Sequence, residues 1–342
     1  MKTFEITIKP ISGFCTPFKG DTLFGHICWQ AAYNDSLFGM TITQLLDDYA
    51  TDPFIVVSSA FPKINDNYAL KRPDMPLDML FEFSGSNKAE VIAKRKELKG
   101  RRWMVAKTQS KLKSIKSEGL YLNDEQLLGM IATSKDAETQ RQLRKKGIKS
   151  LVFDFAQLHN TINRLTGTTG ESQFAPYSVD QMVFIKEAEL VIFAGLRDDI
   201  TIDSVITALK QIGATGFGKD SSIGLGKFEV SDYKEIDLRS IGADNPNACY
   251  TLAPCIPEKD FFSKIFFAPF TRFGRHGDVL AKSGRPFKNP VIMADEGAVF
   301  IVKDRDIFHK PYIGTAVSGI SKAEPKAVTQ GYSLYIPIKV EA

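Results

Sequence analysis

The residues best suited to chemistry lie in a glycine-rich run at positions 213–226. Glycines at short spacing remove β-carbons, which lets another backbone or a ligand approach closely. An ammonium group and two hydroxyls stand among them, and such groups bind phosphates. The alternative is a glycine-rich turn that only reverses the chain. The candidate binding residues of this run are Gly216, Phe217, Gly218, Lys219, Ser221 and Ser222.

The glycine-rich run does not fit the common nucleotide-binding fingerprints. A dinucleotide-binding motif follows a strand and opens a helix, whereas this run follows apolar residues at helical spacing and precedes a strand. Lys219 also lies outside the frame that a phosphate-binding P-loop requires. A Rossmann site and a P-loop are therefore excluded as interpretations of these glycines.

A second candidate is the segment Thr16–Trp29, a loop that leads into a helix. Free backbone amides and the helix dipole at such a junction favour anions, so Lys19 is a candidate anion contact. His26 falls in the first turns of that helix, where it is either a general base, a structural residue or an RNA contact. No second catalytic side chain accompanies it in the sequence, so we favour the structural or RNA-contacting roles.

Two further clusters repeat the combination of cations, aromatic rings and glycines. In the first, His159, Asn163 and Arg164 precede Phe174 and Tyr177, and on a helix His159 and Asn163 would share a face. The alternative for this cluster is a polar, mobile turn. The second cluster alternates cations with Phe273 and Phe287. Its candidate residues are Arg272, Arg275, His276, Arg285 and Lys288.

The charge distribution favours a polyanionic partner. The chain has a net charge of +4, yet residues 88–149 hold 17 Lys/Arg and 7 Asp/Glu, a local balance of +10 (17 minus 7), which leaves −6 elsewhere (+4 minus +10). Clustered cations gain affinity for phosphate backbones by releasing counterions. A solvated helical face is the simpler alternative, but Trp103 and Tyr121 lie among the cations and are suited to nucleotide stacking.

Periodicity predicts the elements that position these residues. Apolar and polar residues alternate over 4–8, which predicts a strand. Asp21-Thr22 predicts the N-cap of a helix, and the apolar run Ile55-Val56-Val57 predicts a second strand that ends at Pro62. Strand 189–193, helix 202–212 and strand 225–230 repeat this order. We therefore expect an α+β chain whose first domain, 1–245, is ferredoxin-like (RRM-like) and carries a basic helix and hairpin insertion at about 84–178.

The remainder, 246–342, is expected to be a second, β-rich ferredoxin-like domain, because short apolar runs alternate with glycine and proline. Four cysteines without zinc-finger spacing and the lack of a long apolar run favour a cytoplasmic protein with no membrane partner. We expect neither a cofactor nor a metal.

The glycine run resembles the signature of RAMP proteins, the ferredoxin-fold RNA binders of CRISPR systems. Four further segments narrow the resemblance to the fourth Csm subunit of type III-A effector complexes. They are Thr16–Trp29, Ala60-Phe61-Pro62, 159–169 and 290–300. It implies a non-catalytic subunit that caps the 5′ handle of CRISPR RNA. Its neighbours would be a large polymerase-like subunit and the adjacent backbone RAMP subunit, and the inserted region would contact target RNA indirectly, as a thumb that wedges into the guide–target duplex.

The resemblance also assigns roles to residues of this chain. The glycine loop would contact the handle, Lys19 and His26 would flank the RNA groove, and Arg164 would belong to the thumb. Three alternatives stay open. They are the equivalent subunit of type III-B complexes, a CRISPR RNA-processing endoribonuclease with His26 as acid or base, and an unrelated nucleotide-binding ferredoxin-fold protein.

Overall fold

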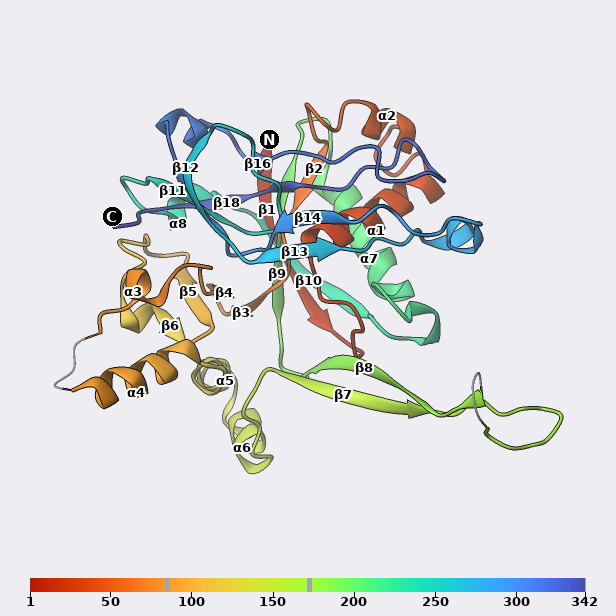
Figure 1. The fold of residues 1–342 in the computed structure, drawn as a ribbon, viewed down its shortest axis with the longest axis horizontal. Helices are drawn as coiled ribbons and strands as arrows, with labels where there is room; N and C mark the ends of the chain where they lie inside the picture. The colour runs from red at the N-terminus through yellow and green to blue at the C-terminus, as the bar shows by residue number, and fades with distance from the viewer. Residues whose placement is uncertain (84–86, 171–173, 342) are drawn as a thin grey trace.

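The protein is a mixed α/β molecule with antiparallel sheets in a computed structural model that describes residues 1–83, 87–170 and 174–341 (Figure 1). Its largest sheet has eight strands in the order β10-β1-β9-β3-β4-β5-β6, and β2 also pairs with β9. In the described part of the chain, no helix is long and apolar enough to cross a membrane.

The centre of this sheet is formed by segments far apart in the sequence. β1 (Lys2–Pro10) lies between β9 (Leu190–Leu196) and β10 (Phe228–Glu235), and β2 (Ile55–Val57) lies on the other side of β9. Every one of these pairings is antiparallel. Alternation along β1 sends Ile6 and Ile8 into the core, as the period-two pattern predicts.

Two helices supply the apolar layer that covers this sheet. α1 (Gly20–Tyr33) and α7 (Ile202–Thr215) contact each other, α1 also contacts β2, and α7 contacts β10. The buried residues of α7 recur at helical spacing, which is the pattern that predicted it. Each fully buried aliphatic side chain contributes about 1.5–3 kcal/mol, so this layer fixes the ends of α1 and α7 where the candidate loops begin.

The segment between β2 and β9 extends the sheet and adds helices beside it. β3 (Phe61–Ile64), β4 (Asn67–Lys71), β5 (Trp103–Lys107) and β6 (Tyr121–Leu122) continue the sheet toward its far edge. The predicted insertion thus includes strands of the main sheet as well as helices. The helices of this segment are α3 (Leu77–Leu80), α4 (Lys88–Lys99), η1 (Glu118–Leu120), α5 (Asp124–Thr133) and α6 (Ala137–Lys145), while α2 (Ile42–Asp47) precedes β2.

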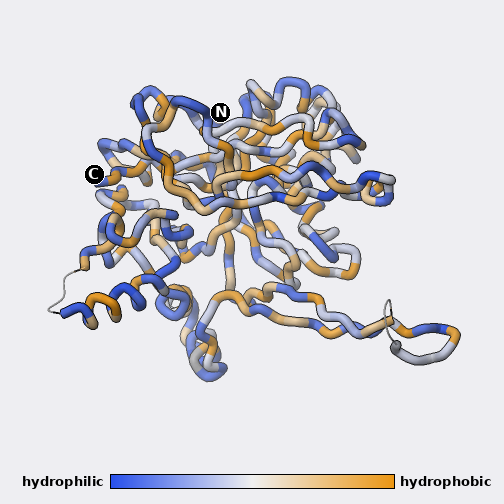
Figure 2. Tube along the Cα trace, viewed as in Figure 1, coloured by the Kyte–Doolittle hydropathy of each residue, from blue (hydrophilic) through white to orange (hydrophobic). Residues whose placement is uncertain are grey.

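A long hairpin stands away from the body of the molecule. β7 (Val152–His159) and β8 (Tyr177–Phe184) pair in register along their whole length and project to one side in Figure 1. Its root is held by a bridge between Phe14 and Met182. Most side chains of β7 are exposed, including apolar ones, and Figure 2 shows apolar stretches along the hairpin.

The C-terminal part is rich in strands. β11 (Ala248–Thr251), β12 (Phe262–Phe266), β15 (Val299–Val302) and β18 (Tyr335–Ile338) form a four-stranded antiparallel sheet in the order β12-β15-β11-β18. Two antiparallel pairs accompany this sheet, β13 (Pro269–Arg272) with β14 (Val291–Ala294) and β16 (Ile313–Gly314) with β17 (Tyr332–Ser333). The short helices of this part are η4 (Asp278–Lys282) and η5 (Arg305–His309), while η3 (Ser221–Ile223) and α8 (Leu238–Ile241) lie before it in the chain.

The N-terminal and C-terminal parts share one hydrophobic core. Leu252, Val299 and Leu334 belong to the same buried cluster as Ile6 and Ile8. The buried Gln330 strengthens the junction, because its side-chain amide accepts from the backbone N–H of Val57 (2.9 Å) and donates to the carbonyl of Val57 (2.7 Å). The two parts are therefore fixed against each other.

Three local predictions differ from the structure. Lys19 occupies the N-cap position of α1, so Asp21 lies inside the first turn instead of capping it. Pro62 lies within β3, where its pairing with Leu190 does not need a proline N–H. His159 ends a strand, so the helical face that it would share with Asn163 does not form.

Candidate functional site

The glycine loop between α7 and β10 has a backbone that only glycine adopts easily. Gly216, Gly218 and Gly226 have φ of +105°, +80° and +76°. A β-carbon on Gly226 would lie 2.1 Å from the carbonyl oxygen of Phe217, and one on Gly218 would lie 2.5 Å from the β-carbon of Thr16. The glycines therefore allow the loop to pack tightly against itself and against the loop that precedes α1.

Hydrogen bonds join the glycine loop to the segment before α1. The N–H of Lys219 donates to the hydroxyl of Thr16 (2.9 Å), and the N–H of Gly226 donates to the carbonyl of Gly13 (2.7 Å). Phe217 is fully buried, and its ring stacks on Phe18 with 4.3 Å between centroids. The two loops that the sequence selected independently thus form one surface.

His26, which lies in α1, contacts the glycine loop directly. The N–H of Gly218 donates to its Nε2 atom (3.0 Å), and its ring lies 4.9 Å from that of Phe217. Burial lowers the pKa of His26 to about 4, so the ring is neutral near pH 7 and carries its proton on Nδ1. In this arrangement Nε2 is occupied as an acceptor, and the histidine positions the loop without offering a positive charge.

The outer side of the glycine loop is polar and accessible. The side chain of Lys219 is 68% exposed, and its Nζ lies 3.7 Å from a carboxylate oxygen of Asp220. Asp220 has a positive φ of 62°, which turns the chain so that Ser221 and the exposed Ser222 follow in a short 3₁₀ turn. An ammonium group and two hydroxyls on a rigid backbone are suited to holding phosphate oxygens.

Lys19 and Arg272 are held in ion pairs between the two parts of the molecule. The Nζ of Lys19 lies 2.5 Å from Asp295 and 2.7 Å from Glu296, and the lysine is only 13% exposed. Arg272 forms a two-pronged pair with Asp21, with 2.8 Å between Nη2 and Oδ1. These two candidates face carboxylates at a seam between the parts, and are separated from the solvent side of the glycine loop.

The candidates near residue 160 lie on the projecting hairpin. The ring of His159 stacks on Tyr177 with 5.3 Å between centroids. Asn163 forms a bridge with Thr168 and begins a tight turn in which Arg164 is exposed. The hairpin therefore carries these residues away from the body of the molecule (Figure 1).

The remaining candidates lie in the excursion between β13 and β14. His276 is buried and hydrogen-bonded to Ser321 (2.7 Å), and burial together with Lys288 lowers its pKa. Burial also lowers the pKa of Lys288. Arg275 lies over the exposed ring of Phe287 at 5.6 Å, and Arg285 is exposed. This excursion thus has a structural histidine and two solvent-facing arginines.

Sequence reasoning missed the apolar surface of the hairpin. Phe155 and Leu158 are 52% and 81% exposed, and Leu165 at the tip is 97% exposed. The β-branched and aromatic residues Val152, Phe153 and Phe155 could have revealed the strand, but their exposure depends on which other elements cover the strand in the folded chain. Such a large apolar surface is typical of a binding surface.

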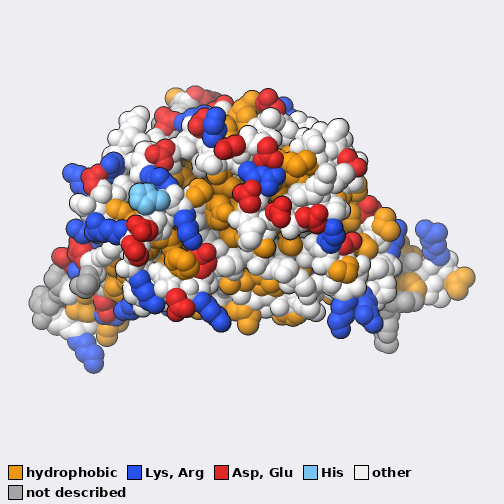
Figure 3. Space-filling view, turned by 90° about the horizontal axis from the view of Figure 1, so that it is seen from above, with side chains coloured by type: hydrophobic (Ala, Val, Ile, Leu, Met, Phe, Trp, Pro, Cys, Tyr) orange, Lys and Arg blue, Asp and Glu red, His pale blue; other side chains and the backbone are white. Residues whose placement is uncertain are grey.

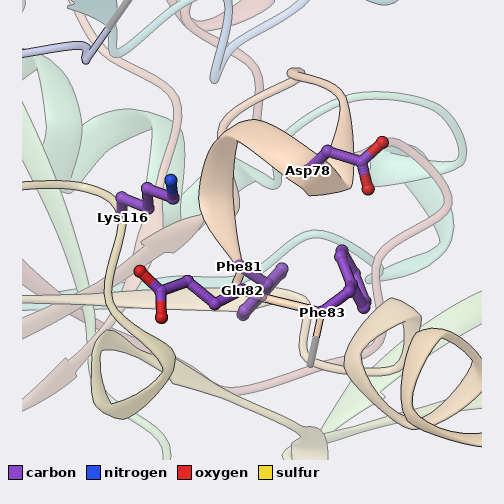
Figure 4. Close-up of a pocket in the computed structure, with 5 residues that line it drawn as sticks. All are labelled: Asp78, Phe81, Glu82, Phe83 and Lys116. Atoms are coloured by element: carbon purple, nitrogen blue, oxygen red, sulfur yellow. The ribbon is translucent and has the colours of Figure 1, made fainter. Parts of the chain in front are cut away.

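One hollow of the surface is poorly suited to a nucleotide. It has a volume of about 390 Å³ and is lined by Asp78, Phe81, Glu82, Phe83 and Lys116, so it has two carboxylates and a single lysine (Figure 4). Repulsion from these carboxylates disfavours a phosphate group there. Within the described residues, no group of three or more metal-ligating side chains forms a metal site.

The fold has relatives among solved structures. The structure of a Csm3–Csm4 subcomplex of a type III-A CRISPR-Cas interference complex aligns with 98% of this chain and 99% of its own, at 17% identity and a TM-score of 0.57. Two structures of a Csm1–Csm4 cassette, with AMPPNP and with pppApA, align at 15% identity over 100% of this chain and 98% of theirs, with TM-scores of 0.56 and 0.54. No protein-family profile and no curated protein match the sequence.

These alignments show that this chain has a mixed α/β fold with antiparallel sheets that is shared with solved subunits of type III-A CRISPR complexes. More particularly, the fold is that of Csm4, the subunit that all three solved structures contain. The resemblance inferred from the sequence is therefore confirmed at the level of the fold.

Proposed function

We propose that this chain is a non-catalytic RNA-binding subunit that caps the 5′ handle of CRISPR RNA in a type III-A effector complex. The observation that carries the proposal is the locked glycine loop. His26 and Thr16 fix its backbone from within, while Lys219 and Ser222 are exposed and Ser221 is half-buried between them. A rigid loop loses little conformational entropy when it binds phosphates, which suits a permanent cap on a short RNA end.

The strand order supports two ferredoxin-like units. β10-β1-β9-β2, with α1 and α7 on one face, has the order of a β-α-β-β-α-β unit. The order β12-β15-β11-β18 repeats it with irregular crossovers in place of long helices. The C-terminal part is proposed to be a reduced copy of the same unit.

The hairpin β7–β8 is proposed to be the thumb. Its exposed apolar residues could contact base pairs or splayed bases, since stacking and apolar contacts tolerate any sequence. Arg164 at its tip adds a cation that would contact the phosphate backbone of the RNA. In this arrangement the chain would contact target RNA only indirectly, through the duplex that the target forms with the guide.

The solved relatives indicate the protein partners that this chain would have. They are described as Csm4 with Csm3 and Csm4 with Csm1. We propose that this chain likewise binds an adjacent backbone RAMP subunit and a large polymerase-like subunit. Type III-A membership is preferred because these alignments cover nearly the whole chain.

The test is binding of labelled RNA with a repeat-derived 5′ handle, beside a scrambled RNA of equal length, across a salt series. We expect preference for the handle and affinity that falls as salt rises. Lys219→Ala should weaken handle binding by about 1 kcal/mol, roughly fivefold, through loss of one charge-assisted contact. Lys259→Ala, which removes an exposed lysine of the C-terminal part, is the matched control.

Arg164→Ala tests the proposed thumb in the same assay. It should weaken binding of a guide–target duplex more than binding of the handle alone. Unchanged affinity in both variants would refute the assignment of these sites. Cleavage of the RNA that is lost in His26→Ala would instead support a processing endoribonuclease, a role that the neutral, hydrogen-bonded His26 disfavours.

A further inference from the structure

Helix α4 separates its charged side chains onto two faces. On the inward face, Lys94 pairs with Glu118 (3.4 Å), and Arg95 pairs with Asp78 (2.5 Å). The buried Leu98 anchors the same face against the body. These contacts fix the orientation of the helix, so the residues on its other face have a defined direction.

The outward face of α4 is a lysine stripe. Lys88, Ile92, Lys96 and Lys99 recur at spacings of four, four and three, which places them on one side of the helix. All four are exposed, and Ile92 is 57% exposed. Within the described residues, none of the three lysines has an ion pair. The acidic Glu97 lies on a different side and pairs with Arg101 (2.9 Å).

Helix α6 adds further exposed cations to this part of the molecule. Leu143 is buried in a small core with Leu127 and Leu128 of α5, which fixes α6 against the sheet. Arg141 and Lys145 share the outer side of α6, and exposed lysines 146 and 149 follow it. Among the residues that the structure describes, these four cations also have no carboxylate partner.

The two helices lie on the same side of the molecule. α4, α5 and α6 line the margin from which the hairpin β7–β8 extends (Figure 1). They belong to the part of the sheet that ends in β5 and β6, whereas the glycine loop leads into β10 at the opposite edge. The basic surface formed by α4 and α6 is therefore separate from the glycine loop.

The arrangement of charge indicates an RNA backbone as the occupant. On the face seen in Figure 3, basic and acidic side chains are intermixed around an apolar centre, as on an ordinary solvated surface. The outward face of α4 instead presents lysines with no carboxylate among them, and on the outer side of α6 the exposed Glu138 accompanies Arg141 and Lys145. Each such cation that meets a phosphate releases condensed counterions, and the exposed Ile92 offers a contact for an unstacked base.

We propose that the outward faces of α4 and α6 form a second RNA-binding surface, which holds the phosphate backbone of RNA that runs past the root of the hairpin. The surface would be sequence-independent, because lysine side chains contact phosphates and not base edges. The inference shares with the proposed function only the assumption that RNA is the ligand. It adds a site that the handle does not occupy.

The test compares three forms of the full chain. Lys88→Ala with Lys96→Ala and Lys99→Ala removes the α4 stripe. Lys303→Ala with Lys322→Ala and Lys339→Ala removes three exposed lysines of the C-terminal part and changes net charge equally. Each protein is titrated with the handle alone and with an RNA that extends the handle by a long single strand, across a salt series. Thermal melting checks folding, which alanine on an exposed helix face should preserve.

We expect the α4 variant to bind the long RNA more weakly, with a salt slope lower by about 2, because three phosphate contacts contribute about 0.7 each on a single strand. Its binding of the handle alone should be unchanged. Equal weakening in the α4 and control variants would overturn the proposal as a non-specific charge effect. Unchanged RNA binding, with loss of association with a partner subunit, would overturn it in favour of an acidic protein surface.

If the glycine loop did not bind the handle, Lys219→Ala would leave the affinity for the short RNA unchanged while the α4 variant still weakened the long RNA. Failure of the handle site and failure of the helical surface therefore give different results.

Discussion

Lys19 and Lys219 lie on two loops that are hydrogen-bonded to each other, yet the surroundings of their side chains differ. Lys19 is enclosed by Asp295 and Glu296 at the seam between the two parts, whereas Lys219 is 68% exposed on the glycine loop. Although burial acts to raise the pKa of Asp295, Lys19 and Lys71 hold that pKa below its usual value. The comparison separates cations that hold the fold together from cations that are free to bind a ligand.

The largest expected effect is the loss of stability when the seam is broken. Lys19→Ala leaves Asp295 and Glu296 without their shared partner, and removal of one member of a buried ion pair costs roughly 3–5 kcal/mol. Since Lys19 is slightly exposed, we expect about 3 kcal/mol, measured by denaturant unfolding. Lys219→Ala is the control and should leave stability within about 0.5 kcal/mol. If Lys19→Ala left the denaturation midpoint unchanged but weakened RNA binding, both lysines would belong to the cations that bind the ligand.

A second prediction concerns the backbone that holds the exposed loop. Gly226→Ala forces a β-carbon to within 2.1 Å of the Phe217 carbonyl at a φ of +76°, whereas Gly224→Ala meets nothing within 4 Å at a φ of +96°. The left-handed conformation costs an alanine about 1–2 kcal/mol in either case. The clash should make Gly226→Ala the costlier substitution, by at least about 1 kcal/mol in unfolding experiments.

The glycine-loop comparison has a clear opposite outcome. Equal destabilisation by the two alanines would mean that the loop relaxes freely and that the close approach of Gly226 to Phe217 within the loop is not required. Handle binding measured on the same proteins would then show whether rigidity matters for the ligand. We expect Gly226→Ala to weaken it more than Gly224→Ala does.

Local sequence patterns predicted the elements better than they predicted the surroundings of the candidate residues. Alternation revealed β1, helical spacing revealed α7, and glycine spacing revealed the tight loop, because each depends on residues close together in the chain. The partners of Lys19 lie more than 270 residues away, so no local pattern could separate it from Lys219. The stacking of Phe217 on Phe18 is non-local for the same reason.

The hairpin shows a different limit of sequence reasoning. A dense run of polar residues at 159–170 was compatible with a helix or a turn, and only the pairing of β7 with β8 decides between them. The sequence correctly showed the excess of Lys and Arg over residues 88–149, but it did not distinguish cations in ion pairs from cations without one. Arg102 pairs with Asp124, for example, whereas Lys96 faces solvent without an ion pair in the described chain.

The smallest predicted effect is a pH dependence that arises from His26. Its pKa is about 4 in the folded protein and near 6.5 in the unfolded chain, so below pH 6.5 the unfolded state takes up a proton that the folded state refuses. Stability should therefore fall as the pH is lowered from 7.5 to 5.5, with about 1 kcal/mol of the loss due to His26. Thermal unfolding at several pH values measures this loss.

The matched variant for His26 is His26→Gln, which can still accept the hydrogen bond from Gly218 but does not titrate. His276, whose pKa is also lowered, contributes equally to both proteins and cancels in the comparison. We expect the pH curve of His26→Gln to be flatter than that of the wild type. Parallel curves would show that His26 is solvated and becomes charged in acid. It would then be able to contact phosphate directly, as we propose for the exposed Lys219.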